Sequence, residues 1–242
     1  MKAADLPLYY NMCEILEHNL ETRANKIALN SNDGSLTFGE VSRQVNQIGN
    51  ALLRSGAQFG DCVAILCPDR PEWVSSFFAV AKIGAVNVPL NWRLVADELE
   101  FILDDAGTTV LLFSEEFAEL ASELRSRGDK TQISNWIQVG GDTTEGALDY
   151  DDWMGSSSTT EPEIEGGDDD LVFIMYTSGT TGLPKGVMHS HDTVLWANIT
   201  NATTADMQHY DRFLNALPLF HVGALTPIIT SVFVGGSITL MK

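Results

Sequence analysis

Helical patterns and short apolar runs alternate along the first half of the chain, and this alternation constrains the fold more than any other feature. Val41, Val45, Ile48 and Leu52 recur at steps of four, three and four, which predicts a helix with one apolar face. The apolar run 62–66 follows and predicts a buried strand. Alternating helices and strands are typical of βαβ units and a largely parallel sheet, so the expected class is layered α/β.

The same alternation continues to residue 139. Gly56 can close the first helix, and Pro71 and Gly84 suit the start and end of a second one. The apolar face of that second helix would carry Trp73, Val74, Phe77, Phe78 and Ala81. A third amphipathic helix would present Val95, Leu99, Ile102, Leu103 and Ala106. Further strands are expected at 85–90, 109–113 and 136–139.

Between residues 140 and 170 the composition changes to Gly, Ser, Thr, Asp and Glu, which favours a surface loop or linker. The acidic triplet 168–170 could bind a metal, but adjacent carboxylates point in different directions and are more often part of a solvated loop. We therefore divide the chain into a first α/β region (1–139), an acidic linker (140–170) and a region that opens a second α/β unit (171–242).

The net charge limits the partners of this protein. With 33 acidic and 14 basic residues the formal charge is −19, which argues against nucleic acid and anionic membranes as partners. The same field works against long-range attraction of nucleoside triphosphates. Any phosphate site must therefore be built locally.

Cysteine usage and hydropathy point to the cytoplasm. Cys13, Cys62 and Cys67 form no C-x-x-C pair, and their odd number fits a reducing compartment. Cys62 and Cys67 would lie on opposite faces of a strand as small buried hydrophobic residues. The N-terminus lacks the apolar core of a signal peptide, and residues 222–241 suit a helix, a turn and a strand better than a membrane span.

The segment that carries chemistry follows a predicted strand at 171–176. Its glycines allow close approach of a ligand to the backbone, and its hydroxyls can donate to phosphate oxygens. Lys185 supplies a positive charge. The segment comprises Thr177, Ser178, Gly179, Thr180, Thr181, Gly182, Leu183, Pro184, Lys185 and Gly186. A flexible surface loop is the alternative, although such loops rarely follow a buried strand and end in Pro-Lys-Gly.

Two common phosphate-binding motifs do not describe this segment. A Walker loop needs Gly-Lys followed directly by Ser or Thr, whereas Leu183 and Pro184 separate Gly182 from Lys185. The G-x-G-x-x-G turn of dinucleotide-binding folds is also missing from the expected place.

Histidines near this segment have simpler interpretations. His189 and His191 could be paired metal ligands, but no Cys, Asp or Glu lies at a supporting spacing. Ser190 suits a helix N-cap, with Asp192 in the first turn facing the positive helix end. On that helix Trp196 is expected to pack and Asn198 to lie on the surface. His221 taken alone would be a hydrogen-bonded histidine at a strand end.

Four segments in order resemble the adenylate-forming superfamily, which contains acyl-CoA synthetases, aryl-CoA ligases, luciferases and peptide-synthetase adenylation domains. Residues 176–186, YTSGTTGLPKG, resemble its phosphate-binding loop. Residues 36–41 (LTFGEV) and 84–91 (GAVNVPLN) resemble two earlier motifs, and 218–223 (PLFHVG) resembles its F-H-x-x-G motif, with Ala224 where many members have a second glycine. The resemblance covers essentially the whole chain.

This resemblance implies a two-step ligase. A carboxylate attacks the α-phosphate of ATP to give an acyl-adenylate and pyrophosphate, and the thiol of coenzyme A then displaces AMP. Thr177 would help bind Mg²⁺, and His221 would lie beside the acyl group and AMP. The β- and γ-phosphates would be held by Ser178, Gly179, Thr180, Thr181, Gly182 and Lys185. The segment 87–93 together with PLFH favours fatty-acyl or aryl-CoA synthetases over peptide-synthetase domains.

Other family elements are not found in these 242 residues. The Y-G-x-T-E motif, the ribose-binding aspartate, the hinge and the C-terminal domain with its lysine would all follow PLFH. We therefore expect this to be the N-terminal part of the large domain, without turnover by itself. The alternatives are a nucleotide-binding module, or an adenylation domain of another branch of the superfamily. The acid and the oligomeric state remain open.

Overall fold

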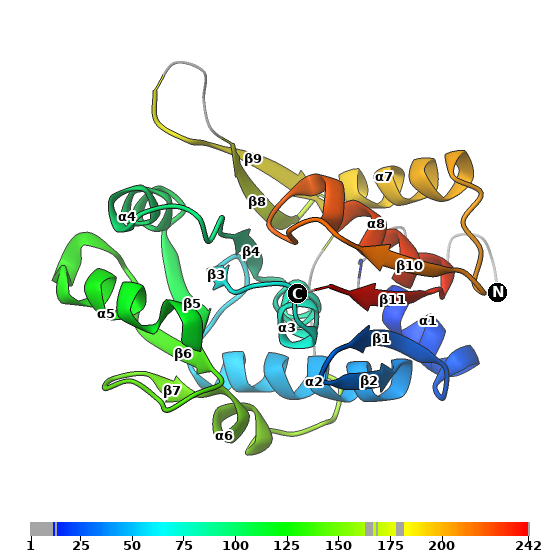
Figure 1. Ribbon diagram of the computed structural model, residues 1–242, viewed down its shortest axis with the longest axis horizontal. Helices are drawn as coiled ribbons and strands as arrows, with labels where there is room; N and C mark the ends of the chain where they lie inside the picture. Colours follow the sequence, from blue (N-terminus) through cyan, green and yellow to red (C-terminus); the bar gives the residue numbers. More distant parts are fainter. Residues whose placement is uncertain (1–11, 13, 163–166, 168, 178–181, 242) are drawn as a thin grey trace.

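The computed structural model describes residues 12, 14–162, 167, 169–177 and 182–241, which form two β-sheets with helices around them (Figure 1). The larger sheet has seven strands. In spatial order they are β7 (Leu148–Asp149), β6 (Asn135–Val139), β5 (Thr108–Ser114), β3 (Cys62–Leu66), β4 (Val86–Pro89), β8 (Leu171–Thr177) and β9 (Lys185–Ser190). Its neighbours are parallel except for the β8–β9 hairpin. The predicted largely parallel α/β fold is confirmed.

Helices bury both faces of this sheet. Val63 and Ile65 of β3 share a core with α2 (Phe38–Arg54) and α3 (Pro71–Lys82), whereas Ala64 and Leu66 share one with α4 (Ala96–Asp105) and α5 (Ala118–Ser126). A parallel strand covered on both faces must be apolar throughout, which explains the unbroken run 62–66. Two 3₁₀ turns, Glu115–Phe117 and Gly128–Lys130, flank α5.

The smaller sheet joins the two ends of the described chain. Its order is β10 (Arg212–Asn215), β11 (Ser237–Leu240), β1 (Ile27–Ser31) and β2 (Gly34–Thr37). Helix α8 (Val222–Val234) packs on β10 and β11, α1 (Glu14–Arg23) lies against α2 and α8, and α7 (His191–Thr204) packs against α8 and the β8–β9 hairpin. β1 pairs in parallel with β11, while β8 and β9 belong to the larger sheet. A boundary near residue 171 therefore does not coincide with a division between the sheets.

Local signals at the helix starts agree with the sequence. Thr37 and Glu40 form a capping box at the start of α2, and Pro71 occupies the first position of α3. The prediction that Val95 belongs to an apolar helix face is wrong, because this residue precedes α4 as its N-cap and its side chain is 62% exposed. Its backbone N–H donates instead to Glu98 Oε2, 3.1 Å away.

The segment 140–170 contains more structure than its composition predicts. It includes β7 and the short helix α6 (Tyr150–Gly155), whose Tyr150 and Trp153 are buried. Trp153 Nε1 donates to Ser55 Oγ at 2.8 Å, which attaches α6 to the end of α2. Two aromatic anchors therefore hold part of a segment that we expected to be a solvated loop. Asp168 of the acidic triplet lies outside the described residues.

A buried lysine ties the end of this segment to two helices. Lys82 Nζ lies 2.6 Å from Glu17 Oε1 and 2.8 Å from Glu161 Oε1, and its side chain is only 1% exposed. Burial alone would lower the pKa of Lys82, but the hydrogen bonds and charges of Glu161 and Glu17 outweigh it and raise the pKa. The ion pairs therefore favour the charged form of this lysine in the folded protein.

Because the pKa of Lys82 is raised on folding, its contribution to stability is fully present below the unfolded value, about 10.5, and is lost as the pH rises through the folded value. We expect Lys82→Met to lower the free energy of unfolding at pH 7 by about 2–3 kcal/mol, because Glu17 and Glu161 lose the cation that pairs with them. It should also reduce the loss of stability above about pH 10.5. Urea unfolding across pH 7–11 measures both effects. If the free energy of unfolding changes with pH in the same way in wild type and variant, Lys82 does not contribute the pH dependence that we assign to it.

Two of the cysteines and the long apolar segment also agree with the sequence predictions, and Cys13 lies outside the described residues. Cys62 and Cys67 are free and buried, one in each of the two cores. Residues 222–241 form α8, a turn at Gly235 and β11. In the part of the chain that the structure describes, no helix has both the length and the apolar character that a membrane span requires.

Candidate active site

The site is built on the β8–β9 hairpin, which projects beyond the other strands of the larger sheet (Figure 1). Thr177 ends β8 and pairs with Lys185, the first residue of β9. Gly182 has φ +154°, a conformation that favours glycine. Ser178, Gly179, Thr180 and Thr181 lie outside the described residues. Thr177, Gly182 and Lys185 thus mark the two arms of the predicted phosphate loop.

A cavity of about 330 Å³ opens beside this hairpin. It brings together three predicted site residues, Thr177, Gly182 and His221, from segments far apart in the sequence. Lys185 is exposed and is not one of the residues that line this cavity. The remaining lining residues are Asn91, Leu94, Glu98, Ile102, Met175, Tyr176, Pro184, Phe220 and Val222.

His221 lies at the N-terminus of α8, as its N-cap, rather than at the end of a strand. Its Nδ1 accepts a hydrogen bond from the Gly223 backbone N–H at 3.1 Å. In the neutral imidazole the other nitrogen, Nε2, then carries the proton and can act as a donor. The N-terminal end of a helix also favours negative charge. This corner of the cavity can therefore stabilise an anionic oxygen.

Asp69, which follows β3, attaches the segment before His221 to the larger sheet. Its Oδ1 accepts from the Leu219 backbone N–H at 2.9 Å, and its Oδ2 accepts from Asn215 Nδ2 at 2.9 Å. Burial raises the pKa of Asp69, and the two hydrogen bonds counteract this only in part. The Asp69 carboxylate, which follows a strand of the larger sheet, thus fixes the backbone two residues before His221.

An aromatic pair separates this cavity from a second one. The rings of Trp92 and Phe220 meet edge to face with centroids 6.0 Å apart, and the Arg93 guanidinium lies 4.7 Å from the Trp92 centroid. Phe220 lines the first cavity. Trp92 and Arg93 line the second, which measures about 590 Å³ and lies beyond the carboxyl ends of β3, β4 and β5.

Sequence reasoning missed the contribution of α4 to the site, and it gave Tyr176, the first residue of the YTSGTTGLPKG segment, no role of its own. Glu98 and Ile102 of α4 line the cavity, as does Tyr176 of β8, whose hydroxyl donates to Asp105 Oδ2 at 2.6 Å. Ile102 was expected to belong only to the core. No local signal brings α4 and β8 together, because their contact depends on the order of strands in the sheet.

Two predictions on α7 are wrong and one is confirmed. Trp196 is 60% exposed, whereas Asn198 is 1% exposed and accepts a hydrogen bond from Thr230 Oγ1 at 3.0 Å. The buried face of α7 consists of His191, Val194 and Asn198, spaced three and four residues apart, so Trp196 falls on the opposite face. Ser190 is the N-cap of α7, as predicted, and Asp192 lies in its first turn.

His189 and His191 make structural contacts, one through ring stacking and the other through a hydrogen bond. His189 stacks on Phe173 with ring centroids 4.4 Å apart, and burial lowers its pKa. His191 Nδ1 accepts from the Met12 backbone N–H at 3.0 Å. Within the described ranges, no group of three or more His, Cys, Asp or Glu side chains is arranged to hold a metal ion.

Comparison with known proteins agrees with this architecture. The profile of the family described as AMP-binding enzyme matches residues 16–242. The long-chain-fatty-acid–CoA ligase FadD13 of Mycobacterium tuberculosis is 39% identical over 212 residues, which cover 87% of this chain and 41% of that protein. Feruloyl-CoA synthase of an Amycolatopsis species is 35% identical over 207 residues, covering 85% of this chain and 39% of that protein.

Solved structures give the same result. The anthranilate CoA ligase AuaEII in complex with anthranoyl-AMP matches with TM-score 0.92 and 40% identity, over 100% of this chain and 46% of that one. The N-terminal domain of FACL13 from Mycobacterium tuberculosis matches with TM-score 0.88 and 35% identity, over 96% of this chain and 57% of that one. This chain spans about two fifths of the length of the curated relatives above. It belongs to the AMP-binding enzyme family.

Proposed function

We propose that the protein is an ATP-dependent acid–thiol ligase that activates a fatty or aryl carboxylic acid and transfers it to coenzyme A. One observation carries this proposal: the arms of a glycine- and hydroxyl-rich loop and the N-cap histidine of α8 face one cavity. The relatives' names support it, since they include a fatty-acid–CoA ligase, a feruloyl-CoA synthase and an anthranilate–CoA ligase.

In the first step an oxygen of the substrate carboxylate attacks the α-phosphorus of ATP. The bond between the α-phosphorus and its bridging oxygen breaks, and pyrophosphate leaves with the electron pair. In the second step the thiol sulfur of coenzyme A attacks the acyl carbon, loses its proton, and AMP leaves. Neither step needs a protein nucleophile, so the protein contributes position and charge.

The hairpin would hold the triphosphate. Lys185 stands at the start of β9 with its side chain exposed, ready to meet phosphate oxygens. Thr177 and Gly182 line the adjoining cavity. Ser178, Gly179, Thr180 and Thr181 complete the loop in the sequence, and we assign them to the β- and γ-phosphates with Gly182 and Lys185. In a chain of charge −19, backbone amides and this ammonium supply the attraction that the overall field lacks.

The residues that are present fit a magnesium ion carried by ATP. A hard cation prefers oxygen ligands, and the Thr177 hydroxyl at the mouth of the loop provides one while phosphate oxygens provide others. When bound, Mg²⁺ neutralises charge on the departing pyrophosphate.

His221 would act beside the reacting acyl group. Its Nδ1 is engaged by Gly223, which leaves Nε2–H as a donor toward an acyl or phosphate oxygen. The same placement at the start of α8 would let the imidazole ring border the path by which the thiol approaches. We further propose a cytoplasmic location, where ATP and reduced coenzyme A are both present.

The test is ATP–pyrophosphate exchange by the complete gene product with a panel of medium-chain, long-chain and aromatic acids. Exchange that depends on an added acid, followed by thioester formation when coenzyme A is supplied, is the expected result. Nucleotide binding without exchange would support a binding module instead. We expect the 242 residues alone to show no exchange. Robust exchange by this chain would contradict the proposal that turnover needs further elements of the family.

A further inference from the structure

We propose that Asp105 and Tyr176 form a positioning pair that fixes the β8–β9 hairpin against α4, so that Thr177 and Lys185 are already in place when the triphosphate binds. This inference rests on the proposed function and adds residues outside the loop's own glycine, hydroxyl and lysine groups.

The geometry of the pair is direct. Tyr176 precedes Thr177 on β8, and its hydroxyl donates to Asp105 Oδ2 at 2.6 Å. Asp105 is the last residue of α4, 71 positions earlier in the sequence. Tyr176 also lines the 330 Å³ cavity together with Thr177 and His221. A single side chain therefore connects β8 to α4, the helix whose Glu98 and Ile102 line the same cavity.

The tyrosine ring also supports the second arm of the hairpin. Tyr176 pairs with Gly186 across the two strands. A Cβ atom at Gly186 would lie 3.1 Å from Tyr176 Cζ and 2.6 Å from Ile174 Cγ2. The absence of a side chain at Gly186 thus lets the ring lie against the backbone that follows Lys185. Fixing the ring fixes both Thr177 and Lys185 at once.

The hairpin has little other cover on its outer arm. Lys185, Gly186, Val187 and Met188 are all exposed, with Met188 at 65%. On the inner arm, β8 pairs with β4 through Asn87 and Phe173, three residues before Tyr176. The far end of the hairpin therefore extends past the sheet, where a lateral hydrogen bond has most effect on the position of the loop.

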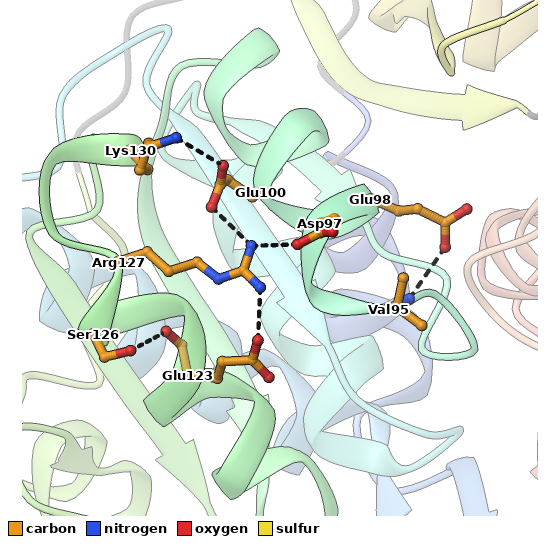
Figure 2. Close-up of polar contacts among 8 residues, drawn as sticks. All are labelled: Val95, Asp97, Glu98, Glu100, Glu123, Ser126, Arg127 and Lys130. Atoms are coloured by element: carbon orange, nitrogen blue, oxygen red, sulfur yellow. Dashed lines mark hydrogen bonds and ion pairs between the residues drawn. The ribbon is translucent and has the colours of Figure 1, made fainter.

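Helix α4 is a firm point of attachment for this hydrogen bond. The Arg127 guanidinium bridges α4 to α5, with 2.7 Å to Asp97, 2.9 Å to Glu100 and 2.6 Å to Glu123 (Figure 2). The hydrogen bonds that the guanidinium donates to these carboxylates, with Glu100 as the largest contribution, raise the pKa of Arg127. Leu99, Ile102 and Leu103 bury the opposite face of α4 in the core. The helix is thus held on both faces.

Tyr176 stays a donor at neutral pH. Burial and then the Asp105 carboxylate raise the pKa of the Tyr176 phenol. The carboxylate in turn needs only its acceptor oxygen for this bond, not its charge. A neutral amide at residue 105 could therefore replace it.

The experiment measures ATP–pyrophosphate exchange by the complete gene product carrying Tyr176→Phe, Asp105→Ala or Asp105→Asn. Loss of this hydrogen bond predicts a KM for MgATP raised by about fivefold to tenfold in Tyr176→Phe and Asp105→Ala, with the KM for the acid unchanged. The double variant should be no worse than either single one, because the two residues act as a unit. Asp105→Asn should recover most of the loss.

Tyr150→Phe is the matched control, since it also removes a single phenol hydroxyl, whose oxygen lies 3.3 Å from Ser76 Oγ, far from the hairpin. It should lower the unfolding temperature to a similar extent and leave the KM for MgATP at the wild-type value. Additive effects of Tyr176→Phe and Asp105→Ala, or an unchanged KM for MgATP in both, would overturn the inference. Absence of exchange in the wild type would instead overturn the proposed function.

Discussion

Lys185→Ala is expected to slow acid-dependent ATP–pyrophosphate exchange by about 100-fold or more, since it removes a charged donor from a developing pyrophosphate. The effect should exceed that of a typical phosphate contact because the chain carries 33 acidic and only 14 basic residues. Initial exchange rates at saturating acid, measured over a range of MgATP concentrations, give the size of the loss. We expect kcat and kcat/KM to fall together.

Lys130→Ala provides the control for a change of net charge. Lys130 is exposed and lies 3.7 Å from Glu100, in the group of charges that joins α4 and α5 (Figure 2). Its removal alters the total charge by the same amount and should leave exchange within about a factor of two of wild type. Equal rates for Lys185→Ala and Lys130→Ala would remove Lys185 from its proposed role.

Asp69→Ala is expected to affect both stability and activity. It would leave the Leu219 backbone N–H without its acceptor and remove one of the two acceptors of the Asn215 side-chain amide, which also donates to the Leu217 carbonyl oxygen at 2.8 Å. Two such losses predict a fall of about 2–4 kcal/mol in the free energy of unfolding. Release of the segment that leads to His221 predicts a fall of about tenfold or more in the exchange rate. Urea unfolding and exchange kinetics on the same preparation measure the two effects.

Asp69→Asn separates the acceptor role of Asp69 from its size. Both partners of Asp69 are donors, so an amide can satisfy one of them through its oxygen but must turn its NH₂ group toward the other. We therefore expect a stability between those of wild type and Asp69→Ala. If Asp69→Ala is as stable and as active as wild type, the tether does not control the position of His221.

Five strands of the larger sheet, β3, β4, β5, β6 and β8, could be predicted because their signals are local, whereas β7 and β9 were not predicted. Pro71 at the start of α3 and the apolar run of β3 lie within the elements that they specify. The glycine- and hydroxyl-rich segment 177–186 likewise predicts a loop from its own residues alone. For such features the pattern in one short window is sufficient.

Features that depend on tertiary pairing could not be predicted in this way. The pairing of β1 with β11 joins residues about 210 positions apart. Neither strand contains a local sequence signal that identifies the other as its partner. Asp69 is polar and follows a strand, like many turn residues, until its contacts with Leu219 and Asn215 are known. Trp196 and Asn198 were assigned from residue type, and the packing of α7 against α8 reversed both assignments.

The most direct test of the central claim uses an acid labelled with ¹⁸O in both carboxylate oxygens, incubated with the complete gene product, ATP, Mg²⁺ and coenzyme A. Attack of the carboxylate on the α-phosphorus predicts that one labelled oxygen appears in AMP, and that acyl-AMP accumulates when coenzyme A is omitted. Mass spectrometry detects both products. Label found in inorganic phosphate, or AMP formed without label, would contradict adenylation of the acid.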